Sequence, residues 1–349
     1  MRLVLIMVGF VLYACAPKQE ANTDKENTTQ VETEQKVIKG GVSQDLNARL
    51  TAINEKIRGD LKNPDLYIKR SSIYSELSDE VAALEDLNRA FGIDSTYLPT
   101  LLAQADFILK RGQITVSMAV LEKAQKLYPE SSSVYTKMGE VYLVAKNLEK
   151  ALKSADEAIR YDKFNAQAYY VKGYTFLEMG DTAKAISSYQ TAVEQDPDHF
   201  DAFLELGLIH LEMNDPLALD YLKNALKIKP TEKRALYSKG MYEQEHKMYN
   251  EAIQTYTDAV KAHPNFREAH HNLGYVHMYY LKLYKEATMY FTRAIKVDPN
   301  YYEAIYNRGY CLELMGDIRN SEKDYVLALS INPSYDLAAK GLSRLRGDK

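Results

Sequence analysis

Residues Ala166–His199 read AQAYYVKGYTFLEMGDTAKAISSYQTAVEQDPDH, and this stretch decides the fold. The pattern predicts two helices of about a dozen residues each, with Met179-Gly180-Asp181 as the turn between them and Asp196-Pro197 as the stop. The first helix contains Gly173 and the second contains Ala185. Small residues at these places let two helix backbones approach closely, while large rings from the partner helix pack over them.

The same unit recurs along the chain. Glycine falls at positions 139, 173, 207, 240, 274 and 309, in steps of 34, 34, 33, 34 and 35 residues. Alanine follows the same rhythm from Ala124 to Ala328, and so does proline from Pro197 to Pro333. The seventh repeat has one extra residue, which we expect in its Tyr280–Lys285 turn.

This helix–turn–helix pattern resembles the tetratricopeptide repeat (TPR) family. The resemblance covers residues 64–335, which is about eight repeats. It implies an all-α fold, a right-handed α-solenoid that forms one elongated domain with N- and C-terminal capping helices.

The first 42 residues do not carry the repeat. Residues 1–15 are expected to be a signal peptide, because Arg2 precedes an apolar run, Leu3–Leu12, that is too short to span a bilayer. The run ends in Leu12-Tyr13-Ala14-Cys15, which resembles the bacterial lipobox; the resemblance implies cleavage before Cys15 and acylation of its thiol. The alternative is an ordinary secretory peptide with an incidental cysteine. Residues 16–42 are polar and are expected to form a disordered tether.

Two further helices are expected to cap the solenoid, because its end faces would otherwise be exposed. Residues 43–63 form the N-terminal cap, with apolar residues in helical spacing at Leu46, Leu50, Ile53 and Ile57. Residues 336–349 form the C-terminal cap. This helix is expected to expose Lys340, Arg344 and Arg346 and to bury Leu337, Leu342 and Leu345.

The chain shows little that could carry out chemistry. Its net charge of −4 argues against a nucleic-acid partner, which needs a basic surface. No serine or cysteine nucleophile has a suitably placed histidine. His270 and His277 share one helix face, but no carboxylate or cysteine completes a zinc-like set. The sequence therefore predicts a protein that is not an enzyme and has no cofactor or metal.

The candidate site is the concave surface of the solenoid. In the TPR family the first helix of each repeat lines this groove, chiefly with its second, fifth, ninth and twelfth residues. The resemblance implies a polar wall in the early repeats, at Ser72, Ser75, Asp106, Thr136 and Glu140. In the later repeats the same places are occupied by Tyr170, Tyr174, Leu204, Leu208, Tyr237, Met241, His271, Tyr275, Met278, Tyr306 and Tyr310. In many TPR domains an asparagine at the sixth position holds a ligand's backbone, and Asn272 and Asn307 fall there.

Two explanations of the later residues remain open. A tightly wound superhelix half-buries its inner wall, and tyrosine suits such a position. Alternatively, the strip is a binding groove, because an exposed apolar patch marks an interaction site and tyrosine and methionine are enriched at adaptable interfaces. TPR co-chaperones bind acidic C-terminal tails through a lysine–asparagine pair that these repeats lack, so such a tail is not the expected ligand.

Together these features predict a bacterial lipoprotein, a scaffold of the cell envelope that binds a protein or peptide partner in its groove. The membrane attachment is the lipid at Cys15. A glycan or peptidoglycan receptor is the alternative, and the absence of tryptophan counts against it. Ala16 stands where an aspartate is associated with inner-membrane retention, which favours the outer membrane over the inner one.

Overall fold

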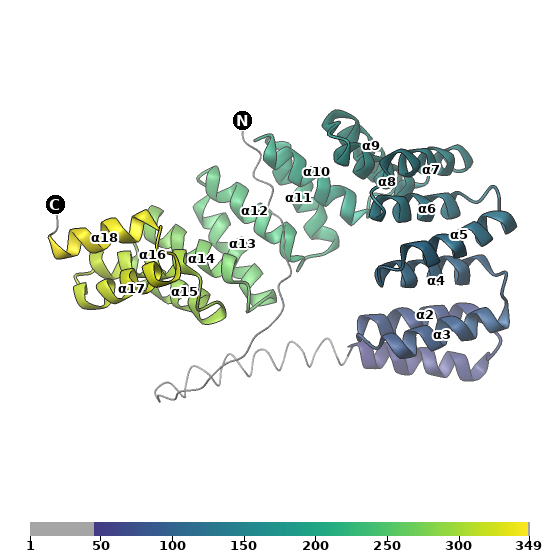
Figure 1. Ribbon diagram of the computed structural model, residues 1–349, viewed down its shortest axis with the longest axis horizontal. Helices are drawn as coiled ribbons and strands as arrows, with labels where there is room; N and C mark the ends of the chain where they lie inside the picture. The colour runs from purple at the N-terminus through teal and green to yellow at the C-terminus, as the bar shows by residue number, and fades with distance from the viewer. Residues whose placement is uncertain (1–44, 348–349) are drawn as a thin grey trace.

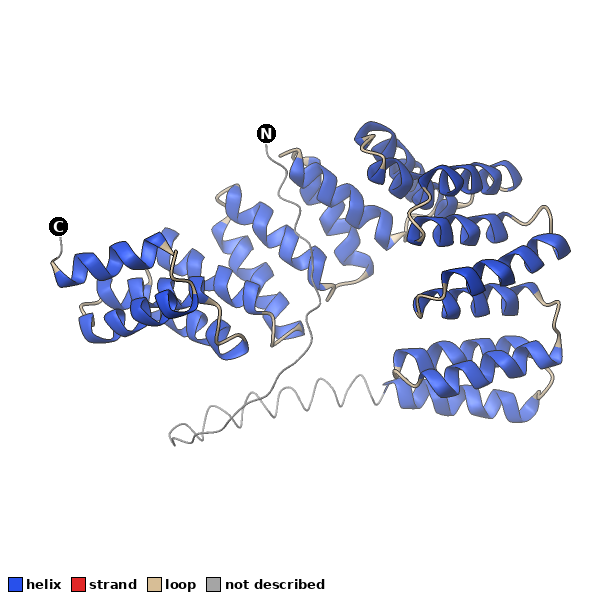
Figure 2. Ribbon diagram, in the orientation of Figure 1, coloured by secondary structure: helices blue, strands red, loops and turns tan. Residues whose placement is uncertain are grey.

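The computed structural model describes residues 45–347. Throughout this range the chain forms helices joined by short turns, with no strand (Figure 2). Eight helix pairs follow one another along an open arc, from the N-terminal pairs at the lower right of Figure 1 to the C-terminal pairs at the left. The predicted all-α solenoid is confirmed.

Each pair consists of an A helix and the B helix that follows it. The A helices are α2 (Pro64–Glu76), α4 (Leu98–Lys110), α6 (Ser132–Val144), α8 (Ala166–Glu178), α10 (Phe200–Glu212), α12 (Lys233–Glu245), α14 (Arg267–Tyr275) and α16 (Tyr302–Leu314). The B helices are α3 (Glu80–Ile93), α5 (Ile114–Leu127), α7 (Leu148–Tyr161), α9 (Thr182–Gln195), α11 (Leu217–Ile228), α13 (Tyr249–Ala262), α15 (Tyr284–Val297) and α17 (Ile318–Ile331). A last helix, α18 (Asp336–Arg346), follows the eighth pair.

The repeating glycines lie where an A helix crosses its B helix. A Cβ atom placed on Gly173 would lie 2.7 Å from Cδ1 of Tyr189, and one on Gly240 would lie 2.5 Å from Cε1 of Tyr256. Real Cβ atoms do not come so close to their neighbours, so any larger residue must push the two helices apart. The period seen in the sequence is therefore the spacing of these close helix crossings.

The turn from each A helix to its B helix contains one residue in the left-handed conformation. Glycine, which adopts this conformation without strain, supplies it at Gly112, Gly180 and Gly316. Non-glycine residues supply it in the other five pairs: Ser78, Lys146, Asn214, Lys247 and Lys282. The turn geometry is thus common to all eight pairs, although its sequence is not.

The extra residue of the seventh repeat lies inside the A helix and not in the turn after it. The α14 helix continues into a π-helical segment, η1 (Val276–Tyr280), where the Leu281 N–H donates to the Val276 carbonyl at 3.2 Å. A π-turn takes up one residue without breaking the helix. The π-turn also rotates the side chains at the end of this A helix relative to those of the other repeats, and this changes which of them face the groove.

Both ends of the described chain are helical. Residues 45–59 form a helix that packs on α2, with Leu46, Ile53 and Ile57 buried in one cluster. In α18, Leu342 and Leu345 pack against the last pair, but Leu337 is exposed, contrary to the prediction. The buried contacts there come from Ala338 and Gly341, because only a small residue fits against the Tyr325 ring.

The predicted signal peptide, the tether over residues 16–42 and the lipidation residue Cys15 lie outside the described residues. Within residues 45–347, no helix has the length and apolar character needed to cross a bilayer.

Candidate functional site: the inner wall of the solenoid

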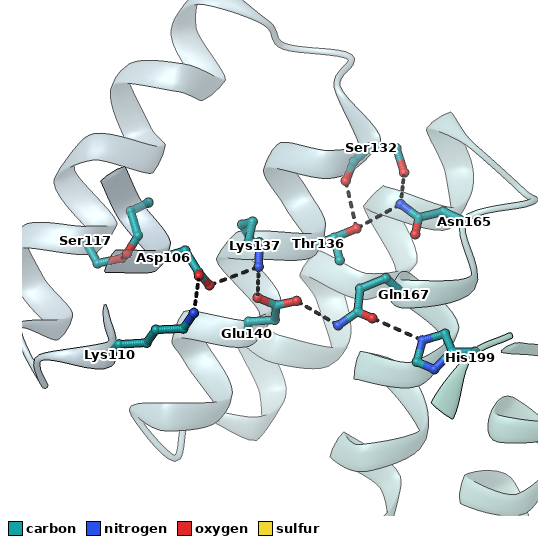
Figure 3. A network of polar contacts seen from close by, with 11 residues as sticks. Asp106, Lys110, Ser117, Ser132, Thr136, Lys137, Glu140, Asn165, Gln167 and His199 are labelled. Atoms are coloured by element: carbon teal, nitrogen blue, oxygen red, sulfur yellow. Dashed lines mark hydrogen bonds and ion pairs between the residues drawn. The ribbon is translucent and has the colours of Figure 1, made fainter. Parts of the chain in front are cut away.

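A ladder of polar side chains connects the A helices of the early repeats (Figure 3). Lys137 of α6 binds Asp106 of α4 at 3.2 Å and Glu140 of its own helix at 2.7 Å. The other carboxylate oxygen of Glu140 accepts from the Gln167 amide of α8 at 2.9 Å, and Gln167 in turn contacts the His199 ring at 3.1 Å. Asp106 and Glu140 are the ninth residues of their helices, so the ninth position lies on the face where neighbouring A helices meet.

The structure brings together three of the five polar residues predicted for the early wall. Asp106 and Glu140 share Lys137, and Thr136 lies one turn before Glu140 on α6, where its hydroxyl accepts from the Asn165 amide at 3.0 Å. Ser72 and Ser75 are exposed on α2, and the Ser75 hydroxyl donates only to the Ser71 carbonyl of its own helix. The sequence did not indicate Lys137, Gln167 or His199, which complete the ladder.

In the later repeats, the fifth residue of an A helix packs between two other aromatic residues. The Tyr170 ring lies 5.6 Å from that of Tyr189 in the same repeat and 5.2 Å from that of His199, just before the next A helix. The same arrangement occurs three more times, as Tyr237 with Tyr256 and Phe266, His271 with Phe291 and Tyr301, and Tyr306 with Tyr325 and Tyr335. These fifth-position rings therefore hold the repeats together, which is the packing explanation of the tyrosine strip.

Tyr189 and Tyr256 occupy equivalent positions in their B helices and pack under this strip. We expect the stability of the protein to respond differently when the hydroxyl of one or the other is removed. The Tyr189 hydroxyl is buried and has no hydrogen-bond partner among the described residues. The Tyr256 hydroxyl accepts from the Asn272 amide at 3.1 Å and donates to the side-chain Oε1 of Gln244 at 3.4 Å. Tyr189→Phe is expected to preserve or raise the free energy of unfolding, while Tyr256→Phe lowers it by about 1 kcal/mol. Urea denaturation of both variants checks this, and an equal loss in the two contradicts it.

The two asparagines predicted to hold a ligand belong to an internal hydrogen-bond chain. The Asn307 amide donates to Nε2 of His271 at 3.0 Å, so the proton of a neutral ring sits on Nδ1 and is donated to Asn272 Oδ1 at 3.3 Å. Asn272 then donates to the Tyr256 hydroxyl. Burial lowers the pKa of His271, which keeps the ring in the neutral form that this series of hydrogen bonds requires. The amide groups of both asparagines thus join consecutive repeats.

Three of the residues predicted to contact a partner are core residues. Leu204, Met278 and Asn307 are only 6%, 5% and 8% exposed. Leu204 packs in the cluster that contains Phe200 and Leu222. Met278 faces the core because it lies in the π-turn, and the 54% exposed Tyr279 takes a place on the surface. The extra residue of the seventh repeat is the sequence signal for the exposure of Tyr279. We expected that residue in the turn, and the structure places it inside the helix.

The ninth residues of the later A helices remain as the accessible part of the wall. We call them the apolar stripe: Tyr174, Leu208, Met241, Tyr275 and Tyr310, all half-buried. The Tyr275 ring stacks on Tyr279 with a centroid distance of 5.4 Å. Since Asp106 and Glu140 occupy this position in the early repeats, the inner wall changes from polar to apolar between α6 and α8.

Comparisons with known proteins agree with this fold. Family models described as TPR or tetratricopeptide repeats match residues 173–214, 136–186, 268–301 and 290–323. Among curated proteins, none matches the sequence. The fold is that of a TPR solenoid, and the four matches show tetratricopeptide repeats over residues 136–214 and 268–323.

Two solved structures show the same architecture. One is the C-terminal part of a TPR repeat-containing protein from Cytophaga hutchinsonii, with 19% identity, a TM-score of 0.58, and coverage of 69% of this chain and 99% of that one. The other is from the APC/C hetero-tetramer Cut9–Hcn1, with 18% identity, a TM-score of 0.54 and coverage of 83% of this chain. This chain spans 57% of the length of that one. At these identities the likeness shows the fold, and TPR solenoids are scaffolds that bind protein or peptide partners.

Proposed function

We propose that this protein is a lipid-anchored scaffold of the cell envelope and that it holds a protein or peptide partner along the inner wall from α8 to α16. The observation that carries the proposal is a difference between two rows of side chains on the A helices. The fifth-position rings account for the packing between repeats, while the apolar stripe at the ninth position has ring and aliphatic surface left uncovered. Most of the stripe residues also pack on the core clusters, but the apolar surface that they leave exposed is typical of an interaction site.

The anchor is the lipid on Cys15, and what supports it is the sequence of residues 1–15, an apolar run that ends in a lipobox-like cysteine. Residues 16–42 link this anchor to the solenoid. Attachment to a membrane raises the local concentration of the solenoid for partners on the same surface. The alanine at position 16 favours the outer membrane as the place of attachment.

Replacing Cys15 with alanine tests the anchor. Cys15→Ala is expected to move the protein from the membrane fraction to the soluble fraction, or to stall its processing, because the thiol is the acylation site. Fractionation after a carbonate wash, which strips proteins held only by partners, measures this. Retention of Cys15→Ala in the washed membranes contradicts the lipid anchor, and Cys311→Ala serves as the matched control because that thiol is buried in the solenoid.

A further inference from the structure

His199 is the N-cap residue of α10, and its ring can act as the cap only in the neutral form. Nδ1 accepts from the Ala202 N–H at 3.2 Å, so the proton of the neutral ring sits on Nε2 and is donated to the Gln167 side-chain oxygen at 3.1 Å. A second proton, on Nδ1, would face a backbone N–H that cannot turn round. It would also place a positive charge at a helix N-terminus, where the helix dipole disfavours it.

Three other A helices have side-chain caps that do not depend on pH in this way. Asn63 caps α2 and Asn165 caps α8, each through a side-chain oxygen that accepts from the first turn. Glu232 does the same for α12. Amide and carboxylate oxygens remain acceptors at the mildly acidic pH that protonates a histidine. The cap of α10 is therefore the one of these four that mild acid removes.

The charged groups around His199 do not reverse its preference for the neutral form. Burial lowers the pKa of His199, which is 8% exposed, and the positive charge of Lys229 lowers it further. The carboxylates of Asp196 and Asp201 raise this pKa, but by less than burial lowers it. Glu205 of the same helix acts in the opposite direction, because burial raises its pKa and its protonation favours the folded helix.

The side chains of α8 beside the His199 ring are uncharged. They are Gln167, which forms the hydrogen bond described above, and Tyr170, whose ring centre lies 5.2 Å from that of His199. Neither offers a negative charge to a protonated ring. The junction between α8 and α10 is thus built for the neutral histidine.

A second buried histidine, His270, lies in α14. It is 6% exposed, and its Nε2 donates to the Pro264 carbonyl at 2.9 Å. Nδ1 is buried and has no hydrogen-bond partner among residues 45–347, so a proton there would find no acceptor. Burial lowers the pKa of His270 more than the Pro264 carbonyl raises it, and Arg293 of α15 lowers it further.

The neighbouring His271 adds to the effect of His270. Burial lowers the pKa of His271 more than the carboxylates of Glu268 and Glu303 raise it. The sequence places all seven histidines of the chain between positions 199 and 277, so the helices α2 to α7 contain none. Any response of histidines to acid is therefore confined to the middle of the solenoid.

We propose that these buried histidines make the middle of the solenoid sensitive to acid, so that mild acidification loosens α10 and α14 while α2 to α7 remain folded. In the unfolded chain a histidine has a pKa near 6.5, so a pH below this value protonates the unfolded ring first and favours local unfolding. At a pH above about 7 this loss is absent. The stripe residues Leu208 and Tyr275 lie on the same two helices, so acid also acts on the inner wall. The inference does not require that the wall bind a partner.

Hydrogen exchange measured by mass spectrometry tests the proposal. The full-length protein in non-ionic detergent is compared at about pH 7.5 and about pH 5.5, with exchange times scaled for the pH dependence of the chemical step. One histidine that stays neutral in the folded chain lowers protection at pH 5.5 by up to about tenfold. We expect a loss of several-fold in α10 and α14 and none in α2 to α7.

The variants exchange a histidine for the residue that another repeat has in its place. His199→Asn copies Asn165, which caps α8 without titrating, and should abolish the acid-dependent loss in α10 but not in α14. His270→Leu copies Leu236 of α12 and should reduce the loss in α14 only. The control is His246→Asn, which replaces an exposed histidine and should leave both losses unchanged.

The readout is the ratio of protection at the two pH values, so a variant that is less stable at both does not imitate the expected result. Loss in α10 that disappears in His199→Asn and persists in His246→Asn supports the proposal. An equal loss in α2 to α7, no loss in α10, or a loss in α10 that persists in His199→Asn overturns it.

Discussion

Gly240→Leu is expected to lower the free energy of unfolding by about 3 kcal/mol, at the upper end for overpacking a close contact. The reason is the ring of Tyr256, whose Cε1 atom lies 2.5 Å from the place of a Cβ atom on Gly240. That ring is held in place, because it is fully buried, its hydroxyl is hydrogen-bonded to Asn272, and the tilted ring of Tyr237 lies 6.4 Å away. The crossing of α12 and α13 must therefore open. Urea denaturation measures the loss.

The damage should stay close to the substituted repeat. Stability in a solenoid is approximately a sum over repeats and their interfaces, so hydrogen exchange is expected to rise in α10 to α15 and much less elsewhere. Gly92→Leu is the matched control, because a Cβ atom on Gly92 meets nothing within 4 Å, and it should not destabilise the protein. Exchange that rises uniformly from α2 to α18 in Gly240→Leu contradicts the modular account.

Tyr174→Ala and Tyr275→Ala are each expected to weaken partner binding about thirtyfold, because aromatic residues in the middle of an interface commonly contribute 2 kcal/mol or more. Both residues belong to the apolar stripe and are half-buried. Isothermal titration calorimetry with the identified partner measures the affinities, and thermal denaturation of the same samples measures stability. The expected pattern is a large loss of affinity with a smaller loss of stability.

Two controls separate binding from packing. Tyr170→Ala removes a fifth-position ring that contacts Tyr189 and His199, so it should lower stability more than Tyr174→Ala does. Ser75→Ala changes an exposed hydroxyl on α2 and should affect neither quantity. If Tyr174→Ala and Tyr275→Ala each change the free energy of partner binding by less than about 0.5 kcal/mol, the stripe is a packing surface and not a binding site.

The repeat could be predicted from the sequence because its small residues are imposed by geometry. Gly173 and Gly240 must be small wherever an A helix crosses its B helix, so the period of the contact appears directly in the chain. The turns were harder to predict. Lys247 and Lys282 adopt the left-handed conformation that Gly180 adopts elsewhere, because the packed helices on both sides determine the turn.

The sequence could predict on which face of each A helix the candidate site lies, but not which residues of that face are accessible. Periodicity indicates which side of a helix a residue occupies, but not whether a neighbour covers it, and for this reason Leu204 and Asn307 were assigned to the surface. Met278 was misplaced for a different reason. One extra residue fits either a longer turn or a π-turn, and only the hydrogen bond from Leu281 to Val276 distinguishes them. The rings that complete the packing, such as Phe266 and Tyr335, follow the same period and could have been found from it.

Photo-crosslinking in intact cells tests the central claim, that the inner wall holds the partner, most directly. A photoreactive amino acid is placed at Leu208 or Met241 on the apolar stripe, or at the exposed Met289 or Val326 on the B helices α15 and α17. The account predicts that both stripe positions capture one and the same protein and that neither B-helix position captures it. Capture of that protein from Met289 and Val326, with none from Leu208 and Met241, contradicts the account and places the partner on the outer surface.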